Sequence, residues 1–272
     1  PHQVNALQVY NNELYLGGWF RRTGNIETNF IAKWNSTGWI VFPNTLNNPV
    51  HVFEEYNGEL YIGGSFDSIG LQPSPYLVRL SGNSWIPSEN HFNGYIEAMA
   101  VYNNELYVGG RFTKIDTLQV NHIARWNGTE WKEVGNGINR SQTQSTAVLS
   151  LSVFNSELYV GGFFVSIGAI QSKNIVKWNG NNWVSLGNEI DGDVMSIEEY
   201  NNELYIGGFF SHNNPELNYF AKLNNFPQYV INNNYKNPAN FSLQQNYPNP
   251  FNPLTTIEFS VSHMRSGSPV VV

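Results

Sequence analysis

The chain has 272 residues, of which 41% are apolar and 15% aromatic, enough to bury one sizeable core or two small ones. Only 13% are charged, and the net charge of −7 without a basic run argues against binding to nucleic acid or to an anionic membrane. The absence of cysteine excludes disulfides, thiol catalysis and cysteine-ligated metals, and no apolar run approaches the roughly 18 residues of a membrane-spanning helix.

Five copies of one motif, Glu-Leu-Tyr-x-Gly-Gly-x-Phe, organise most of the chain. They occupy residues 13–20, 59–66, 105–112, 157–164 and 203–210, and their starts lie 46, 46, 52 and 46 residues apart. This period is typical of four-stranded propeller blades, and it is too long for coiled coils or short solenoids.

Each unit predicts four strands. The first is apolar-rich and ends at an Asn-rich turn whose dipeptides tolerate positive φ. The second carries the motif and ends at Gly-Gly, where a side chain would crowd a bend or a neighbouring backbone. After a loop of about nine residues comes the third strand, and a short turn leads to a fourth strand that opens with tryptophan.

The first strands are predicted at 4–10, 50–56, 96–102, 147–154 and 194–200, and the third strands at 30–34, 76–80, 122–126, 174–178 and 219–223. The fourth strands begin at Trp39, Trp85, Trp131 and Trp183, whereas the fifth unit departs from the pattern at 226–229, as terminal repeats do. We therefore predict an all-β fold over residues 1–231, a propeller of about five four-stranded blades. Whether further blades precede Pro1 is left open.

The second strand closed by Gly-Gly and the fourth opened by tryptophan resemble the kelch-type propeller blade. The fuller Leu-Tyr-x-Gly-Gly-x-Phe…Ala-Lys-Trp-Asn-Gly-x-x-Trp pattern is also similar to the propeller repeats of fungal cortical polarity-marker proteins and of many secreted bacterial proteins. This resemblance covers residues 3 to about 231. It implies the fold but no single activity, because propellers serve as enzymes, adhesins and scaffolds alike.

A charged pair recurs in every unit. The motif glutamate precedes a basic residue inside the third strand by 20 residues in four units and by 19 in the fifth. The pairs are Glu13 with Lys33, Glu59 with Arg79, Glu105 with Arg125, Glu157 with Lys177, and Glu203 with Lys222. We expect one structural ion pair per blade, worth roughly 0–1 kcal/mol if exposed. The alternative is a ring of charges around the central channel.

No catalytic, cofactor-binding or metal-binding residues are predicted. Asp191-Gly-Asp193 lacks the alternating ligands and distal glutamate of a calcium loop. The histidines at 2, 51, 91, 122, 212 and 263 share no metal-ligand spacing. The Trp-Asn-Gly-x-x-Trp turns lack the aspartate and serine of sialidase propellers, and there is no Gly-x-Ser-x-Gly elbow.

An Asn-rich linker is predicted at 232–240, followed by a distinct tail at 241–272. The core of the tail is Asn246, Tyr247, Pro248, Asn249, Pro250, Phe251, Asn252 and Pro253. Its prolines favour an extended chain, and a strand is predicted at 256–261. This order of residues resembles the type A C-terminal sorting domain of the bacterial type IX secretion system.

That resemblance implies export to the cell surface or the extracellular space, with the type IX secretion machinery as a partner. Because the later strands of that domain do not follow, we expect an incomplete sorting domain. An exported protein needs a signal peptide, so we also expect an N-terminus that is processed or truncated before Pro1.

The leading functional hypothesis is a non-enzymatic binding or scaffold module that takes a glycan or a protein through its loops, without a cofactor. The loops after the motif differ freely at 21–23, 67–69, 113–115, 165–167 and 211–213, and the longer spacing places extra residues at 139–146. The alternative is a secreted hydrolase or lyase, which requires convergent carboxylates or a metal in the channel.

Overall fold

In the computed structural model, the described residues are 3–42, 44–82, 84–138, 146–167, 170–187, 190–210, 219–223, 241–243 and 259–261. They form strands and turns, with no helix among them. The chain divides into two compact units, Pro1–Ile231 and Asn232–Val272. The predicted all-β fold is confirmed.

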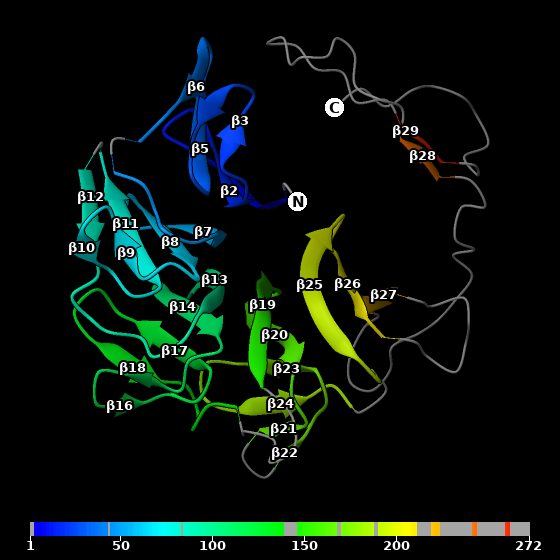
Figure 1. Cartoon of the computed structure of the whole chain (residues 1–272). Helices are drawn as coiled ribbons and strands as arrows, with labels where there is room; N and C mark the ends of the chain where they lie inside the picture. Colours follow the sequence, from blue (N-terminus) through cyan, green and yellow to red (C-terminus); the bar gives the residue numbers. More distant parts are fainter. Residues whose placement is uncertain are drawn as a thin grey trace. The chain divides into compact units, whose positions relative to one another are not determined.

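The first unit is a propeller of five blades (Figure 1). Blade 1 contains β1 (Gln3–Tyr10), β2 (Glu13–Trp19), β5 (Ile31–Asn35) and β6 (Gly38–Ile40). Blade 2 contains β7 (Val50–Tyr56), β8 (Glu59–Gly64), β11 (Leu77–Ser81) and β12 (Ser84–Pro87). Blade 3 contains β13 (Ile96–Tyr102), β14 (Glu105–Gly110), β17 (Ile123–Trp126) and β18 (Trp131–Glu133). Blade 4 contains β19 (Ala147–Phe154), β20 (Glu157–Phe163), β23 (Ile175–Trp178) and β24 (Trp183–Ser185). The described part of blade 5 contains β25 (Asp193–Tyr200), β26 (Glu203–Phe209) and β27 (Phe220–Leu223).

Within each blade the strands pair antiparallel in chain order. The first strands β1, β7, β13, β19 and β25 lie next to one another in that order, so each blade packs against the next (Figure 1). The segment 226–229, where the fifth unit departs from the repeat pattern, lies outside the described residues.

The predicted tight turns join the first and second strands. Asn11 and Asn12 have φ of 49° and 61°, and Asn57 and Gly58 have φ of 51° and 76°. Positive φ at both central positions matches the right-handed twist of the flanking strands. Asparagine and glycine adopt this conformation at low cost, which explains their recurrence at this point of every repeat.

The two glycines of the motif have different steric roles. The first lies against the next blade: a Cβ atom at Gly63 would come 2.5 Å from Ile96 Cγ2, and one at Gly161 2.6 Å from Val194 Cγ1. The second lies opposite a β-bulge, where the register of the first and second strands shifts, and a Cβ atom at Gly64 would collide with the carbonyl oxygen of Pro49.

The third strands begin one residue later than predicted. Phe30, Tyr76 and His122 have φ of 72°, 67° and 72°, outside the β region, and Asn174 and Tyr219 have φ of 61° and 75°. Two backbone hydrogen bonds hold the turn. In blade 2, Tyr76 N–H donates to Phe66 O (2.9 Å) and Gly64 N–H donates to Tyr76 O (3.1 Å).

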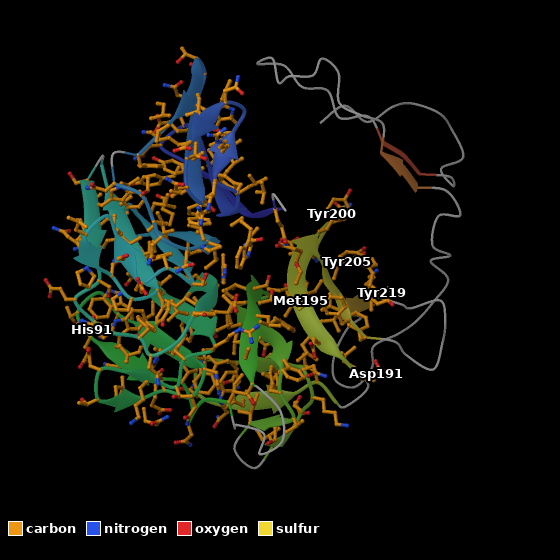
Figure 2. The ribbon with its side chains drawn as sticks, viewed as in Figure 1. His91, Asp191, Met195, Tyr200, Tyr205 and Tyr219 are labelled. Carbon is orange, nitrogen blue, oxygen red and sulfur yellow. The ribbon has the colours of Figure 1, made fainter. Side chains whose placement is uncertain are left out.

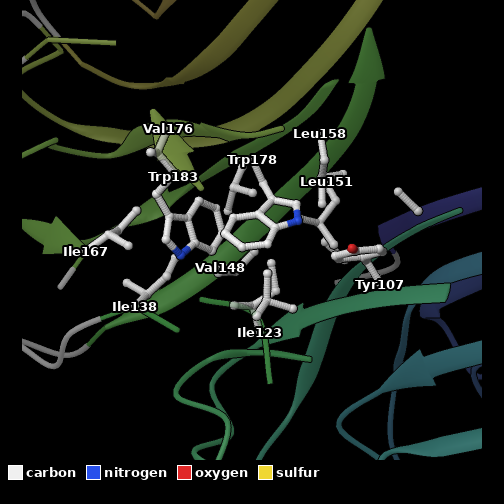
Figure 3. Packing of buried hydrophobic residues seen from close by; sticks show 14 of the residues in the cluster. Tyr107, Ile123, Ile138, Val148, Leu151, Leu158, Ile167, Val176, Trp178 and Trp183 are labelled. Atoms are coloured by element: carbon white, nitrogen blue, oxygen red, sulfur yellow. The ribbon is translucent and has the colours of Figure 1, made fainter. Parts of the chain in front are cut away.

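Four hydrophobic clusters form the core. The cluster between blades 3 and 4 contains Tyr107, Val148, Trp178 and Trp183, and the two tryptophan rings lie side by side in Figure 3. The motif phenylalanine is buried in every blade, as Phe66 and Phe112 illustrate.

In the second unit, β28 (Phe241–Leu243) pairs antiparallel with β29 (Phe259–Val261). The strand predicted at 256–261 is therefore described over its last three residues, and its partner strand is not apparent from the sequence. The sorting motif at 246–253 and the linker at 232–240 lie outside the described residues.

Candidate binding sites

The structure brings the two members of each recurring charged pair together. Nζ of Lys33 lies 2.8 Å from Glu13 Oε2, and Nζ of Lys177 lies 2.6 Å from Glu157 Oε2. The other three pairs in contact are Arg125 with Glu105, at 3.0 Å, Arg79 with Glu59, and Lys222 with Glu203. Each pair joins the second and third strands of one blade and is separate from the first strands that line the channel. The charges are thus neutralised within blades.

A small hairpin projects from the loop between the second and third strands. The four described hairpins are β3 (Arg22–Thr23) with β4 (Ile26–Glu27), β9 (Ser68–Ile69) with β10 (Gln72–Pro73), β15 (Lys114–Ile115) with β16 (Leu118–Gln119), and β21 (Ser166–Ile167) with β22 (Ile170–Gln171). Because the strands of a blade alternate in direction, all four lie at the same end of the propeller.

A buried isoleucine anchors three of these hairpins. Ile69 and Ile115 form β-bridges with Leu46 and Phe92 of the connection that enters the blade, and Ile167 is buried in the same way. The hairpin tips are exposed and differ in chemistry: Leu71 is fully exposed, and Asp116 is a negatively charged tip.

Asparagines of the entering connections fix the hairpins further. Asn47 Oδ1 accepts hydrogen bonds from the backbone N–H groups of Asp67 (3.0 Å) and Ser68 (3.3 Å). Asn93 Oδ1 accepts from Thr113 (2.8 Å) and Lys114 (2.9 Å). The sequence analysis missed this pair, although Asn47 and Asn93 have the same 46-residue spacing as the motif. The hairpins of blades 2 and 3 are thus held at their bases by the same contacts.

A second candidate is a hollow of about 420 Å³ along the first strands of blades 2 to 5. The carboxyl groups on its wall belong to Glu54, Glu97 and Glu198. Ser150 also lines it, and its Oγ accepts a hydrogen bond from Ile197 N–H (2.9 Å), which links blades 4 and 5. Three carboxyl groups therefore line this hollow, which is called the acidic channel below.

Two of these glutamates differ in their electrostatic surroundings. Burial raises the pKa of Glu54 to about 7, against the opposing effect of a hydrogen bond from the Val101 backbone. Burial also acts on Glu97, but His51 Nδ1 at 2.6 Å and Arg111 Nε at 2.7 Å outweigh it and lower the pKa of Glu97. The carboxyl of Glu54 is thus partly protonated near neutral pH, while that of Glu97 is ionised.

Other predicted features are only partly described. Of the extra residues at 139–146, the structure describes only Thr146. The variable loop at 211–213 lies outside the described residues. A membrane-spanning helix is absent from the residues that the structure describes. Within those residues, no three histidine, aspartate or glutamate side chains gather as a metal-binding group.

Comparisons with known proteins agree with the propeller fold. A family model described as "Domain of unknown function (DUF5122) beta-propeller" matches residues 57–84, from the first tight turn of blade 2 to its fourth strand. A search among curated proteins found no match for this chain. The class of the protein is therefore a β-propeller.

Three solved structures are similar at low identity. YjhT is 14% identical with a TM-score of 0.47, over 75% of this chain and 76% of that chain. An ancestral GH74 enzyme is 14% identical with a TM-score of 0.48; the match covers 99% of this chain but only 31% of the enzyme. The computationally designed Ika8 protein is 12% identical with a TM-score of 0.32, over 75% of this chain and 80% of that chain.

Proposed function

We propose that this chain is an exported or cell-surface binding module, a kelch-like propeller that acts without catalysis. Two resemblances support export and the blade type: the order of residues from Asn246 to Pro253, which is similar to type IX secretion sorting domains, and the repeated motif itself. The secretion machinery is the partner that this tail would engage.

The array of hairpins carries the binding proposal. Buried isoleucines and asparagine hydrogen bonds hold the bases, while the tips differ between blades and reach solvent. Binding residues are commonly presented on loops that a rigid scaffold positions. A surface with supported bases and variable tips is suited to recognise one extended ligand, a glycan or a protein, through several blades at once.

The test is binding of the full chain to a glycan array and to proteins extracted from a cell surface. We expect Leu71→Asp and Lys114→Glu to weaken binding about tenfold or more without changing the unfolding temperature. Glu130→Gln, in an exposed turn at the opposite end, is the matched control and leaves binding unchanged. If Leu71→Asp and Lys114→Glu bind as tightly as the parent chain, the ligand binds at another site.

A secreted hydrolase or lyase is the second candidate, favoured by the acidic channel. Glu54, with a pKa of about 7, has the protonation behaviour of a general acid, and Glu97 supplies an ionised carboxylate on the wall of the same hollow. The same glycan panel separates the two functions: release of product that disappears in Glu54→Gln indicates an enzyme, and binding without turnover indicates a binding module.

A further inference from the structure

Blade 2 differs from blades 1, 3 and 4 at one position of the repeat. The residue three places after the fourth-strand tryptophan is Phe42, Val134 or Leu186 in those blades, with exposed fractions of 7%, 0% and 7%. In blade 2 this residue is Ser88, which is small, polar and only partly buried.

The large residues at this position fill the outer part of the interface with the next blade. The Phe42 ring lies 4.8 Å from Trp85 and 6.2 Å from Tyr15, measured between ring centroids. Val134 belongs to the cluster between blades 3 and 4, together with Trp178 and Trp183.

Ser88 has the same backbone environment as Leu186. The N–H of Ser88 donates to Ser74 Oγ (3.2 Å), and that of Leu186 donates to Ser172 Oγ (3.4 Å), 14 residues upstream in both cases. The side chains at the two positions therefore start from matching backbone. What blade 2 lacks is the apolar side chain itself.

A pocket of about 290 Å³ occupies this place between blades 2 and 3. Tyr61, Trp126 and Trp131 contribute aromatic walls. The two tryptophans are partly exposed, whereas their counterparts Trp178 and Trp183 in the filled interface are 4% and 8% exposed. The pocket thus follows from the loss of one apolar side chain.

Hydrogen bonds hold the aromatic walls in place. Trp131 Nε1 donates to Asn90 Oδ1 (3.1 Å), and the Trp126 side chain is hydrogen-bonded to the Tyr61 hydroxyl. Ser88 Oγ donates to Asn90 O (3.0 Å) and accepts from Asn90 N–H (3.2 Å). Since these rings do not have to be ordered on binding, a ligand that stacks on them loses little affinity to reorganisation.

The polar groups of the pocket can form hydrogen bonds with the hydroxyl groups of a ligand. Arg79 is paired with Glu59, and both line the pocket. The Arg79 side chain is 39% exposed, whereas the equivalent Lys33 side chain in blade 1 is 9% exposed. Guanidinium N–H donors and carboxylate acceptors therefore reach the pocket. The third charged residue on the wall is Glu89. Two carboxylates against one guanidinium disfavour an anionic ligand.

From these observations we propose that the pocket between blades 2 and 3 binds a single neutral pyranose ring of a carbohydrate. The C–H face of a sugar ring packs on aromatic rings, and its hydroxyls require paired donors and acceptors of the kind that Arg79 and Glu59 provide. The volume is at the low end for ligand pockets and therefore fits one ring. Among the described residues, none of the small hairpins contributes to the lining of this pocket, so it is a second site, although Asn90 on its wall donates a hydrogen bond to Asp116 at one hairpin tip (3.1 Å).

The test titrates the full chain with methyl glucoside, methyl galactoside, methyl mannoside and glucuronic acid, followed by NMR of the indole N–H groups. We expect at least one methyl glycoside to shift a subset of indole signals and to bind about tenfold or more tightly than glucuronic acid. Absence of binding by all three glycosides, or equal binding of glucuronic acid, would overturn the proposal.

Ser88→Leu introduces the residue found at the equivalent Leu186 of blade 4 and should abolish binding, because the side chain fills the pocket. Ser88→Ala loses the same hydroxyl but leaves the pocket open, so it should bind within about threefold of the parent. Trp126→Leu, which introduces the residue found at the equivalent Leu80, should weaken binding about tenfold or more even if Ser88→Leu unfolds. Binding of Ser88→Leu or Trp126→Leu at parental affinity would exclude this pocket and leave the hairpin proposal intact.

Discussion

At the scale of single residues, the surroundings of Glu54 change the protonation of its side chain near neutral pH. It lies on β7 at the acidic channel, and its pKa rises from the usual 4.5 to about 7 because burial disfavours the charged form. The native state therefore binds more protons than the unfolded state between these two pH values. It follows that the free energy of unfolding falls as the pH rises through this range.

We expect Glu54→Gln to remove this pH dependence. The variant should match the parent near pH 4 and exceed its free energy of unfolding above pH 7 by up to about 3 kcal/mol, less wherever water in the channel reaches the carboxyl. Urea unfolding at pH 4, 6 and 8 measures the difference, with Glu55→Gln on the exposed side of the same strand as control. An unchanged slope in Glu54→Gln would show that Glu54 is fully hydrated.

At the scale of strands and turns, the motif is explained by packing rather than by chemistry. The first glycine admits the β-branched residue of the next blade, the second admits a bulge, and the phenylalanine is buried beneath the following turn. A residue with positive φ then starts each third strand. At Phe30, Tyr76, His122 and Tyr219 this conformation costs roughly 1–3 kcal/mol per residue, and the two backbone hydrogen bonds that recur in every blade offset part of it.

The first glycine of blade 4 provides a test with an internal control. A Cβ atom at Gly161 would come 2.6 Å from Val194 Cγ1, so Gly161→Ala should lower the free energy of unfolding by about 1–3 kcal/mol. At the equivalent Gly207, the nearest atom of the described residues is Tyr219 O at 3.7 Å, so Gly207→Ala should be nearly neutral. Equal losses in denaturant unfolding of the two variants would contradict the blade-contact explanation.

The sequence predicted these elements to different degrees. The first strands at 50–56, 96–102 and 147–154 agree with the structure at both ends, because apolar periodicity and a turn dipeptide mark them. The small hairpins were not predicted, since strands of two residues have no period. The pocket was not predicted either: Ser88 reads as an ordinary loop residue until its interface is seen to lack the apolar side chain found at Phe42.

At the scale of the whole molecule, successive blades contact one another through their first strands, and the end blades are the most exposed. Leu7 and Val9 of blade 1 are 61% and 65% exposed, and Tyr200 and Phe209 of blade 5 are 66% and 69% exposed. In Figure 2, Met195, Tyr200, Tyr205 and Tyr219 all lie on blade 5. The strands of blades 2 and 3 have no comparably exposed apolar side chain among the described residues.

We therefore expect the propeller to open from its end blades. In hydrogen exchange followed by mass spectrometry, amides of β1 and β26 should exchange before those of β13 and β14, because strands whose apolar side chains are more exposed have a lower local stability. Simultaneous exchange of all five blades would instead indicate a single cooperative unit.

The contact between a motif glycine and the next blade has an evolutionary consequence. It recurs as Gly17 with Val50, Gly63 with Ile96, Gly109 with Val148 and Gly161 with Val194, and the partner is always a β-branched side chain. Such an interface does not distinguish one blade from another. Recombination between equivalent turns could therefore delete or duplicate a whole 46-residue unit and still leave every blade with a compatible neighbour. Gene rearrangement can change the number of blades without new core mutations, while a single substitution at a position such as Ser88 changes only one interface.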